Sequence, residues 1–182
     1  MMKKLNMSKQ GWGFAVIFFI LAAYYTFTRA HFAGWKSVKV TFHFLDGTVL
    51  LSSLVSMVTL LLFYIICTLL PSRRIVIIPT IFTLLLAGQE LALSYYTLPV
   101  GDILGGLVVF VGTILLVWIA YLYAQVSFAV IDTIKDADEG NYFSRWIRRV
   151  KISVVKEWRA LIVAIILYAL LNASIVMTLT LK

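Results

Sequence analysis

The amino-acid sequence predicts an all-α integral membrane protein, built as a bundle of five transmembrane helices. Hydrophobic residues make up 62% of the chain and charged residues 13%, whereas soluble domains average about 45–50% and about 25%. A soluble protein of 182 residues has too little interior to hide this much apolar surface. The length predicts one domain, residues 1–182.

Five apolar stretches are long enough to cross a bilayer, since a hydrocarbon core of about 30 Å requires about 20 apolar residues in a helix. We expect the spans at residues 11–28, 48–70, 75–98, 102–131 and 160–181. The first span follows several lysines, as a signal peptide would. Its length and the poor cleavage site Thr-Arg-Ala favour a retained helix.

The connections between the spans differ in kind. Pro-Ser-Arg-Arg at 71–74 and Pro-Val-Gly at 99–101 predict tight turns between antiparallel neighbours. The loop at 29–47 is longer, and its residues 38–44 alternate like a β-strand. A course along the membrane interface is the open alternative for this loop.

Residues 132–159 form the longest polar segment, and we expect a cytoplasmic amphipathic helix there, before the last span. The segment begins with an acidic stretch that ends in a turn at residues 139–141. Apolar residues then recur at helical spacing: Phe143, Trp146, Ile147, Val150, Val154 and Trp158. The basic residues lie largely on other faces: Arg145, Arg148, Arg149, Lys151, Lys156 and Arg159. Together with Trp146 and Trp158, they are candidate partner-binding or lipid-binding residues, because anionic lipid attracts each cation by about 1 kcal/mol.

Lysine and arginine predict the orientation, because cytoplasmic loops retain them. With the N-terminus inside, 12 of the 16 lie inside: Lys3, Lys4, Lys9, Arg73, Arg74, Lys135 and the six cations of the amphipathic helix. Only Arg29, Lys36, Lys39 and Lys182 lie outside. We therefore expect a multi-pass protein of the inner (cytoplasmic) membrane, with a cytoplasmic N-terminus and an external C-terminus.

Glu90 is the one acidic residue deep inside a predicted span. A charged side chain near mid-bilayer costs about 2.5–3.5 kcal/mol on insertion scales, so it usually faces protein or water. Residues at helical spacing around it are small or polar: Thr80, Thr83, Ala87, Ser94 and Thr97. Depth counting places Ser56, Gly112 and Asn172 level with it. We expect a neutral carboxyl hydrogen-bonded to Asn172; an ion or proton site lined by Glu90, Asn172, Thr83, Ser94 and Ser56 is the alternative.

Small residues predict close helix packing. Gly101, Gly105 and Gly112 share one face of the fourth span, with a GxxxG pair at its start. Thr48, Ser52, Ser56 and Thr59 share a face of the second span. Packing within one subunit is the main interpretation, and contact between subunits is the other.

The sequence predicts no metal site and no cofactor. His31, His43 and Asp46 share one outer loop region, but two histidines twelve residues apart are weak evidence for a metal. No histidine lies inside a span to hold haem, and we find no phosphate loop, nucleophile elbow or paired carboxylates. The net charge of +8 follows from the cytoplasmic cations, so we expect no direct contact with nucleic acid.

These observations favour a non-enzymatic, homo-oligomeric membrane subunit that anchors or senses at the bilayer and recruits a cytoplasmic or membrane partner through residues 132–159. Subunits of respiratory, secretion or phage-defence complexes have comparable compositions, which is an analogy only. The alternative is a small ion or proton channel or transporter that uses the polar face around Glu90. An intramembrane enzyme ranks behind both, because Glu90 has no catalytic partner in the sequence.

Overall fold

The computed structural model describes residues 9–70, 72–134 and 141–181. Its helices are α1 (Lys9–Phe32), α2 (Gly47–Cys67), α3 (Ile77–Tyr96), the short 3-10 helix η1 (Leu98–Val100), α4 (Ile103–Ile134) and α5 (Tyr142–Ala173), and its strands are β1 (Trp35–Phe42) and β2 (Ile175–Leu181). Residues 135–140, which hold most of the predicted acidic stretch and of the predicted turn at 139–141, fall outside the described residues, as do Lys3, Lys4 and Lys182.

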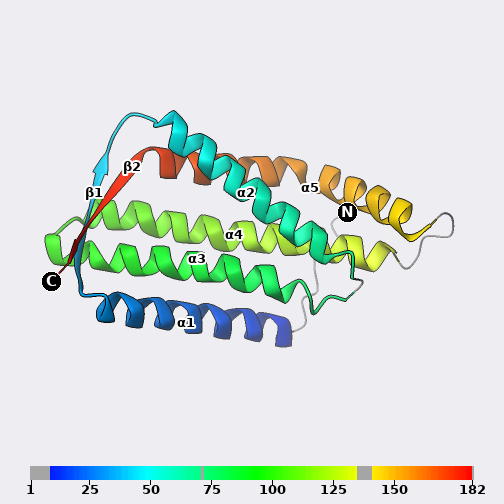
Figure 1. Cartoon of the computed structure of the whole chain (residues 1–182), viewed down its shortest axis with the longest axis horizontal. Helices are drawn as coiled ribbons and strands as arrows, with labels where there is room; N and C mark the ends of the chain where they lie inside the picture. Colours follow the sequence, from blue (N-terminus) through cyan, green and yellow to red (C-terminus); the bar gives the residue numbers. More distant parts are fainter. Residues whose placement is uncertain (1–8, 71, 135–140, 182) are drawn as a thin grey trace.

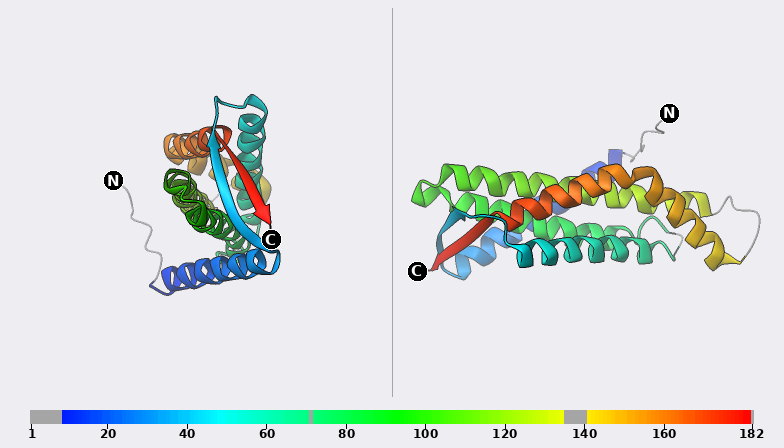
Figure 2. Two further views of the ribbon diagram at one scale, coloured as in Figure 1. Left: turned by 90° about the vertical axis from the view of Figure 1, so that its left-hand side faces the viewer. Right: turned by 90° about the horizontal axis from the view of Figure 1, so that it is seen from above.

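The five long helices run side by side as an elongated bundle (Figure 1). Helix α1 packs on α3, α3 on α4, α4 on α5, and α5 on α2. The two strands and η1 gather at one end, which we call the sheet end (Figures 1 and 2). At the opposite end, which we call the basic end, α4 and α5 extend further than α1 and α3 (Figure 1).

Four helical segments are long and apolar enough to cross a membrane: Ala15–Phe32, Gly47–Cys67, Ile77–Val100 and Ile103–Ile134. The predicted fifth span does not meet this criterion. The stretch of α5 without charged residues, 160–173, covers only about 21 Å at 1.5 Å per residue. An 18-residue window that ends at Ala173 begins at Lys156 and takes in Lys156, Glu157 and Arg159.

The predicted C-terminal boundary of the last span, residue 181, is also wrong. Helix α5 stops at Ala173, and residues 175–181 form β2, which pairs antiparallel with β1. In that register Val38 lies opposite Leu179 and Val40 opposite Met177. The chain therefore contains a two-stranded sheet and is not all-α. The strand alternative for the long loop is the one observed, with bounds Trp35–Phe42.

The amphipathic helix and the last span are one continuous helix, not two elements. α4 and α5 each contain 32 residues, about 48 Å at 1.5 Å per residue. Either helix is therefore longer than the hydrocarbon core, which is about 30 Å thick.

Side-chain caps explain where several helices begin. The Asp46 carboxylate accepts hydrogen bonds from the backbone N–H groups of Thr48 and Val49, and the Asn141 side chain accepts one from Ser144. Hydrogen bonds from the Thr48 hydroxyl and from these N–H groups lower the pKa of Asp46. Asp102 accepts from the N–H of Gly105 and also from the N–H of Val40 in β1, so the same carboxylate joins α4 to the sheet.

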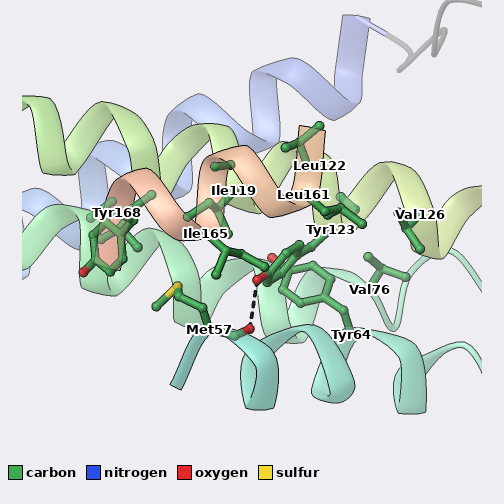
Figure 3. Close-up of a cluster of buried hydrophobic side chains, with 14 of the residues drawn as sticks. Met57, Tyr64, Val76, Ile119, Leu122, Tyr123, Val126, Leu161, Ile165 and Tyr168 are labelled. Atoms are coloured by element: carbon green, nitrogen blue, oxygen red, sulfur yellow. Dashed lines mark hydrogen bonds between the residues drawn. The ribbon is translucent and has the colours of Figure 1, made fainter. Parts of the chain in front are cut away.

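The core lies between α2, α3, α4 and α5, around two buried tyrosines (Figure 3). The rings of Tyr64 and Tyr123 meet edge to face, with centroids 5.4 Å apart. The Tyr123 hydroxyl donates to the backbone oxygen of Met57 over 2.8 Å, and the Tyr64 hydroxyl lies 3.1 Å from that of Thr83. Each buried hydroxyl thus has a partner, as a low-dielectric interior requires.

Contacts at the basic end bind the α5 start to α2 and the α2–α3 turn to α4. Tyr142 donates to the backbone oxygen of Leu69 over 2.6 Å, and the Trp146 indole donates to the Thr68 hydroxyl over 2.8 Å. Arg73 forms a two-pronged ion pair with Asp132 on α4.

Gly88 permits the close contact between α1 and α3. A Cβ at this position would lie 3.0 Å from the backbone carbon of Ala22 and from the backbone nitrogen of Ala23. Backbone atoms do not yield as a flexible side chain does, so a methyl group there would push the two helices apart.

We expect Gly88→Ala to reduce the free energy of unfolding by about 1–3 kcal/mol, the usual cost of overpacking. Thermal unfolding in detergent measures this change. Gly13→Ala is the matched control, because Gly13 is an exposed α1 residue whose Cβ would meet nothing within 4 Å. Equal melting temperatures for the two variants would contradict the close α1–α3 contact.

Candidate functional site

Glu90 lies on the face of α3 that turns into the bundle, where Thr83 and Ala87 are fully buried. One carboxylate oxygen, Oε1, accepts a hydrogen bond of 2.6 Å from the Tyr168 hydroxyl on α5. The other, Oε2, is buried and has no hydrogen-bond partner among the described residues. It lies against Gly112 of α4, where any Cβ would collide with it. Three helices thus surround the carboxyl group.

The hydrogen-bond partner of Glu90 is Tyr168. The sequence analysis predicted Asn172, and this prediction is wrong. The Asn172 amide donates to the backbone oxygen of Tyr168, one turn away. The error follows from the end of the helix: α5 stops at Ala173, so Tyr168 and not Asn172 lies as far from the sheet end as Glu90 does. The predicted connection between the third and fifth helices is present, through a different residue.

The other predicted polar residues do not assemble around Glu90. The Thr83 hydroxyl donates to the Pro79 backbone oxygen, and the Ser94 hydroxyl donates to that of Gly106. Ser56 is exposed on the outer face of α2. The Ser94 bond joins α3 to α4, and Thr83 contacts the Tyr64 hydroxyl of α2, so neither hydroxyl group forms one polar site with Glu90.

The three glycines predicted to share one face of the fourth span have two different roles. Gly105 and Gly112 do pack within the chain: a Cβ at Gly105 would collide with Asp102 and Val40. Gly101 is not part of α4. It caps η1 with φ of +72°, a left-handed conformation that favours glycine.

A second candidate site is the exposed side of the first half of α5, which we call the α5 basic surface. It consists of Arg148, Lys151, Ile152, Val155, Lys156, Trp158 and Arg159, all exposed. Arg149 is half-buried, and so is Arg145, which contacts other groups. Cations and apolar side chains alternate on this surface, and the Arg159 guanidinium lies 5.6 Å from the centre of the Trp158 ring.

Trp146 does not belong to this surface. Its hydrogen bond to Thr68 and its stacking on Phe143 hold it against the end of α2. The helical spacing of the apolar residues identified Trp146 as a face residue, but spacing does not reveal which face the bundle covers.

The described residues contain no group of three or more His, Cys, Asp or Glu side chains that could hold a metal ion. His43 Nδ1 lies within hydrogen-bond distance of the backbone oxygen of Phe44. His31 lies near the end of α1. The available chemistry is therefore a carboxyl group enclosed between helices and a basic, partly apolar surface.

Sequence reasoning missed two sets of residues. Tyr168 lies four residues after Ala164 on the buried side of α5, a spacing that places a polar ring in the bundle. The Thr68–Trp146 and Arg73–Asp132 pairs join residues 78 and 59 positions apart. No local pattern indicates contacts over such distances along the chain.

We expect Glu90→Gln to leave the unfolding free energy nearly unchanged, since the amide oxygen can accept from Tyr168. Glu90→Leu should cost about 1–2 kcal/mol, the scale of hydrogen bonds between membrane helices. Tyr168→Phe supplies the second arm of a double-mutant cycle, which should report a coupling of about 0.6–1.7 kcal/mol. A coupling of zero would show that this contact does not stabilise the bundle.

Comparison with known proteins returned no matching family model, no matching curated protein and no matching solved structure.

Proposed function

We propose that this chain is a non-enzymatic, homo-oligomeric membrane subunit that recruits a cytoplasmic protein with an acidic surface through the α5 basic surface. The observation that carries the proposal is the exposure of four cations on a helix that continues into the bundle. Among the described residues, no acidic side chain forms an ion pair with Arg148, Lys151, Lys156 or Arg159. Their charge is thus available to a partner.

Membrane insertion is supported by what the bundle exposes. Large apolar side chains point outward along the helices, including Leu51 and Val55 of α2 and Leu104 of α4, which are 64%, 56% and 64% exposed. Apolar surface on this scale is unstable in water. We infer that α1 to α4 cross the bilayer and that α5 crosses with its apolar part, its cations reaching the interface by snorkelling.

The orientation follows from the two ends. The basic end carries Arg73, Arg74 and the α5 basic surface, whereas described cations near the sheet end are Arg29, Lys36 and Lys39. Cytoplasmic segments retain cations. We therefore place the basic end in the cytoplasm and the sheet end outside, in the inner membrane.

Self-association is supported by the outer face of α2. Thr48, Ser52, Ser56 and Thr59 are all exposed there, on a helix that this proposal places in lipid. Small polar residues at such a position let a second helix approach closely. No other element that the structure describes covers this face, so we assign it to a neighbouring copy.

An ion or proton channel is the second candidate, because Glu90 Oε2 is buried and no described residue forms a hydrogen bond with it. Glu90→Gln in liposomes distinguishes the two functions. A channel would lose its ion flux while the protein still assembles, whereas recruitment of a cytoplasmic protein would be unaffected.

Cysteine labelling checks the orientation. In a Cys67→Ser background, Ser144→Cys should be protected from an impermeant thiol reagent in intact cells, and Lys36→Cys should react. Both positions are exposed in the folded chain, so protection reports the membrane and not burial. Labelling of Ser144→Cys from outside would reverse the topology.

Charge reversal checks the recruitment. Arg148→Glu with Lys151→Glu should reduce recovery of the cytoplasmic partner in a gentle-detergent pull-down by at least about tenfold, because two attractions become repulsions. Lys36→Glu with Lys39→Glu is the matched control, with the same change in net charge at the sheet end. Equal recovery with both double variants would remove the α5 basic surface from the function. Loss of binding to anionic vesicles alone would assign the surface to lipid.

A further inference from the structure

An open groove of about 570 Å³ lies over α3, between α1 and α2, at a place the proposed function does not use. Its floor is Phe82, Leu85, Leu86 and Gln89 of α3. Its walls include Tyr25, Arg29 and Trp35 on one side and Leu60 and Phe63 on the other. The volume lies within the range of small-molecule sites, about 300–1,000 Å³.

The polar groups of the groove lie towards one end. Gly88 against Ala22 and Ala23 sets the register of α1 and α3, which run in the same direction. In that register Arg29 lies six residues nearer the sheet end than Gln89, about 9 Å. Trp35, at the start of β1, lines the same groove as Arg29. An arginine flanked by aromatic rings is the composition of a headgroup interface.

The length of the groove matches one leaflet. From Arg29 to Phe82 the same register spans 13 residues, about 20 Å. The Phe63 and Phe82 rings, whose centroids are 6.1 Å apart, line the end of the groove away from Arg29. Half of a bilayer with its headgroups measures about 20–22 Å. Between these ends Tyr25, Thr26 and Gln89 supply polar groups, and the rest of the lining is apolar, as an acyl chain requires.

Arg29 can also bind an anion. Its side chain is exposed, and in the described part of the chain it forms no ion pair with an acidic residue. We propose that the groove binds one anionic phospholipid of the outer leaflet, with its phosphate on the Arg29 guanidinium and an acyl chain lying over α3. This inference rests on the membrane insertion proposed above and not on the recruitment of a partner.

Native mass spectrometry of the full chain in detergent tests the inference. The probes are phosphatidylglycerol and phosphatidylcholine with identical acyl chains. We expect phosphatidylglycerol to bind in preference, and Arg29→Gln to reduce that preference about fivefold, the effect of one cation at an anionic headgroup. Arg29→Lys should retain most of it. Leu86→Trp should reduce binding of both lipids, because the larger side chain fills the apolar floor.

Lys39→Gln is the matched control, since it removes one exposed charge at the sheet end outside the groove. An equal loss in Lys39→Gln and Arg29→Gln would overturn the site, and so would equal binding of the two lipids by the unmodified chain. A dimer that Leu86→Trp breaks, with no lipid bound, would assign the groove to a second copy. Recovery in the membrane fraction is measured first: a chain absent from membranes overturns the insertion, whereas an embedded chain without lipid preference overturns only this inference.

Discussion

Helices α3 and α4 approach each other along glycine positions of α4, and the arrangement of the remaining elements depends on that contact. The backbone oxygen of Gly106 accepts a hydrogen bond from the Ser94 hydroxyl. The missing side chains of Gly106 and Gly112 leave room for Thr97 and for the Glu90 carboxyl group. Side chains at these positions would separate the two helices. Such close approach lets backbone and small polar groups form hydrogen bonds between the two helices. These directional contacts select one arrangement of the helices, which apolar contacts alone do not.

The same helix pair positions the outer elements. Because Glu90 reaches across the space beside Gly112, it meets Tyr168 and so connects α3 with α5. At the sheet end, Asp102 begins α4 and also accepts from Val40 of β1. The two strands are therefore attached to the bundle by a side chain of the central helix and not only by their own pairing.

Most hydroxyl groups in the bundle have internal partners, which leaves the distinctive chemistry at its surface. Tyr64, Thr83, Tyr123 and Ser127 all form hydrogen bonds within the chain. Two surface features differ from an ordinary lipid-facing bundle: the exposed cations of α5 at one end, and the apolar groove with Arg29 near the other. They lie at opposite ends, so the protein partner and the lipid that we propose would contact separate surfaces.

The sequence by itself determined the helical character, four of the apolar segments and the strand-forming pattern of residues 38–44, because hydropathy and alternation are local properties. It also identified Gly105 and Gly112 as positions of close packing, and Glu90 as a carboxyl group hydrogen-bonded to a neighbouring helix. Only the tertiary structure decided that residues 175–181 form a strand, since β1, more than 130 positions earlier, provides the edge with which they pair. Because the strand begins at Ile175, α5 ends at Ala173. That position of the helix end brings Tyr168, and not Asn172, level with Glu90. Likewise, apolar spacing located a helix around Trp146, but the end of α2 decided which of its faces is covered.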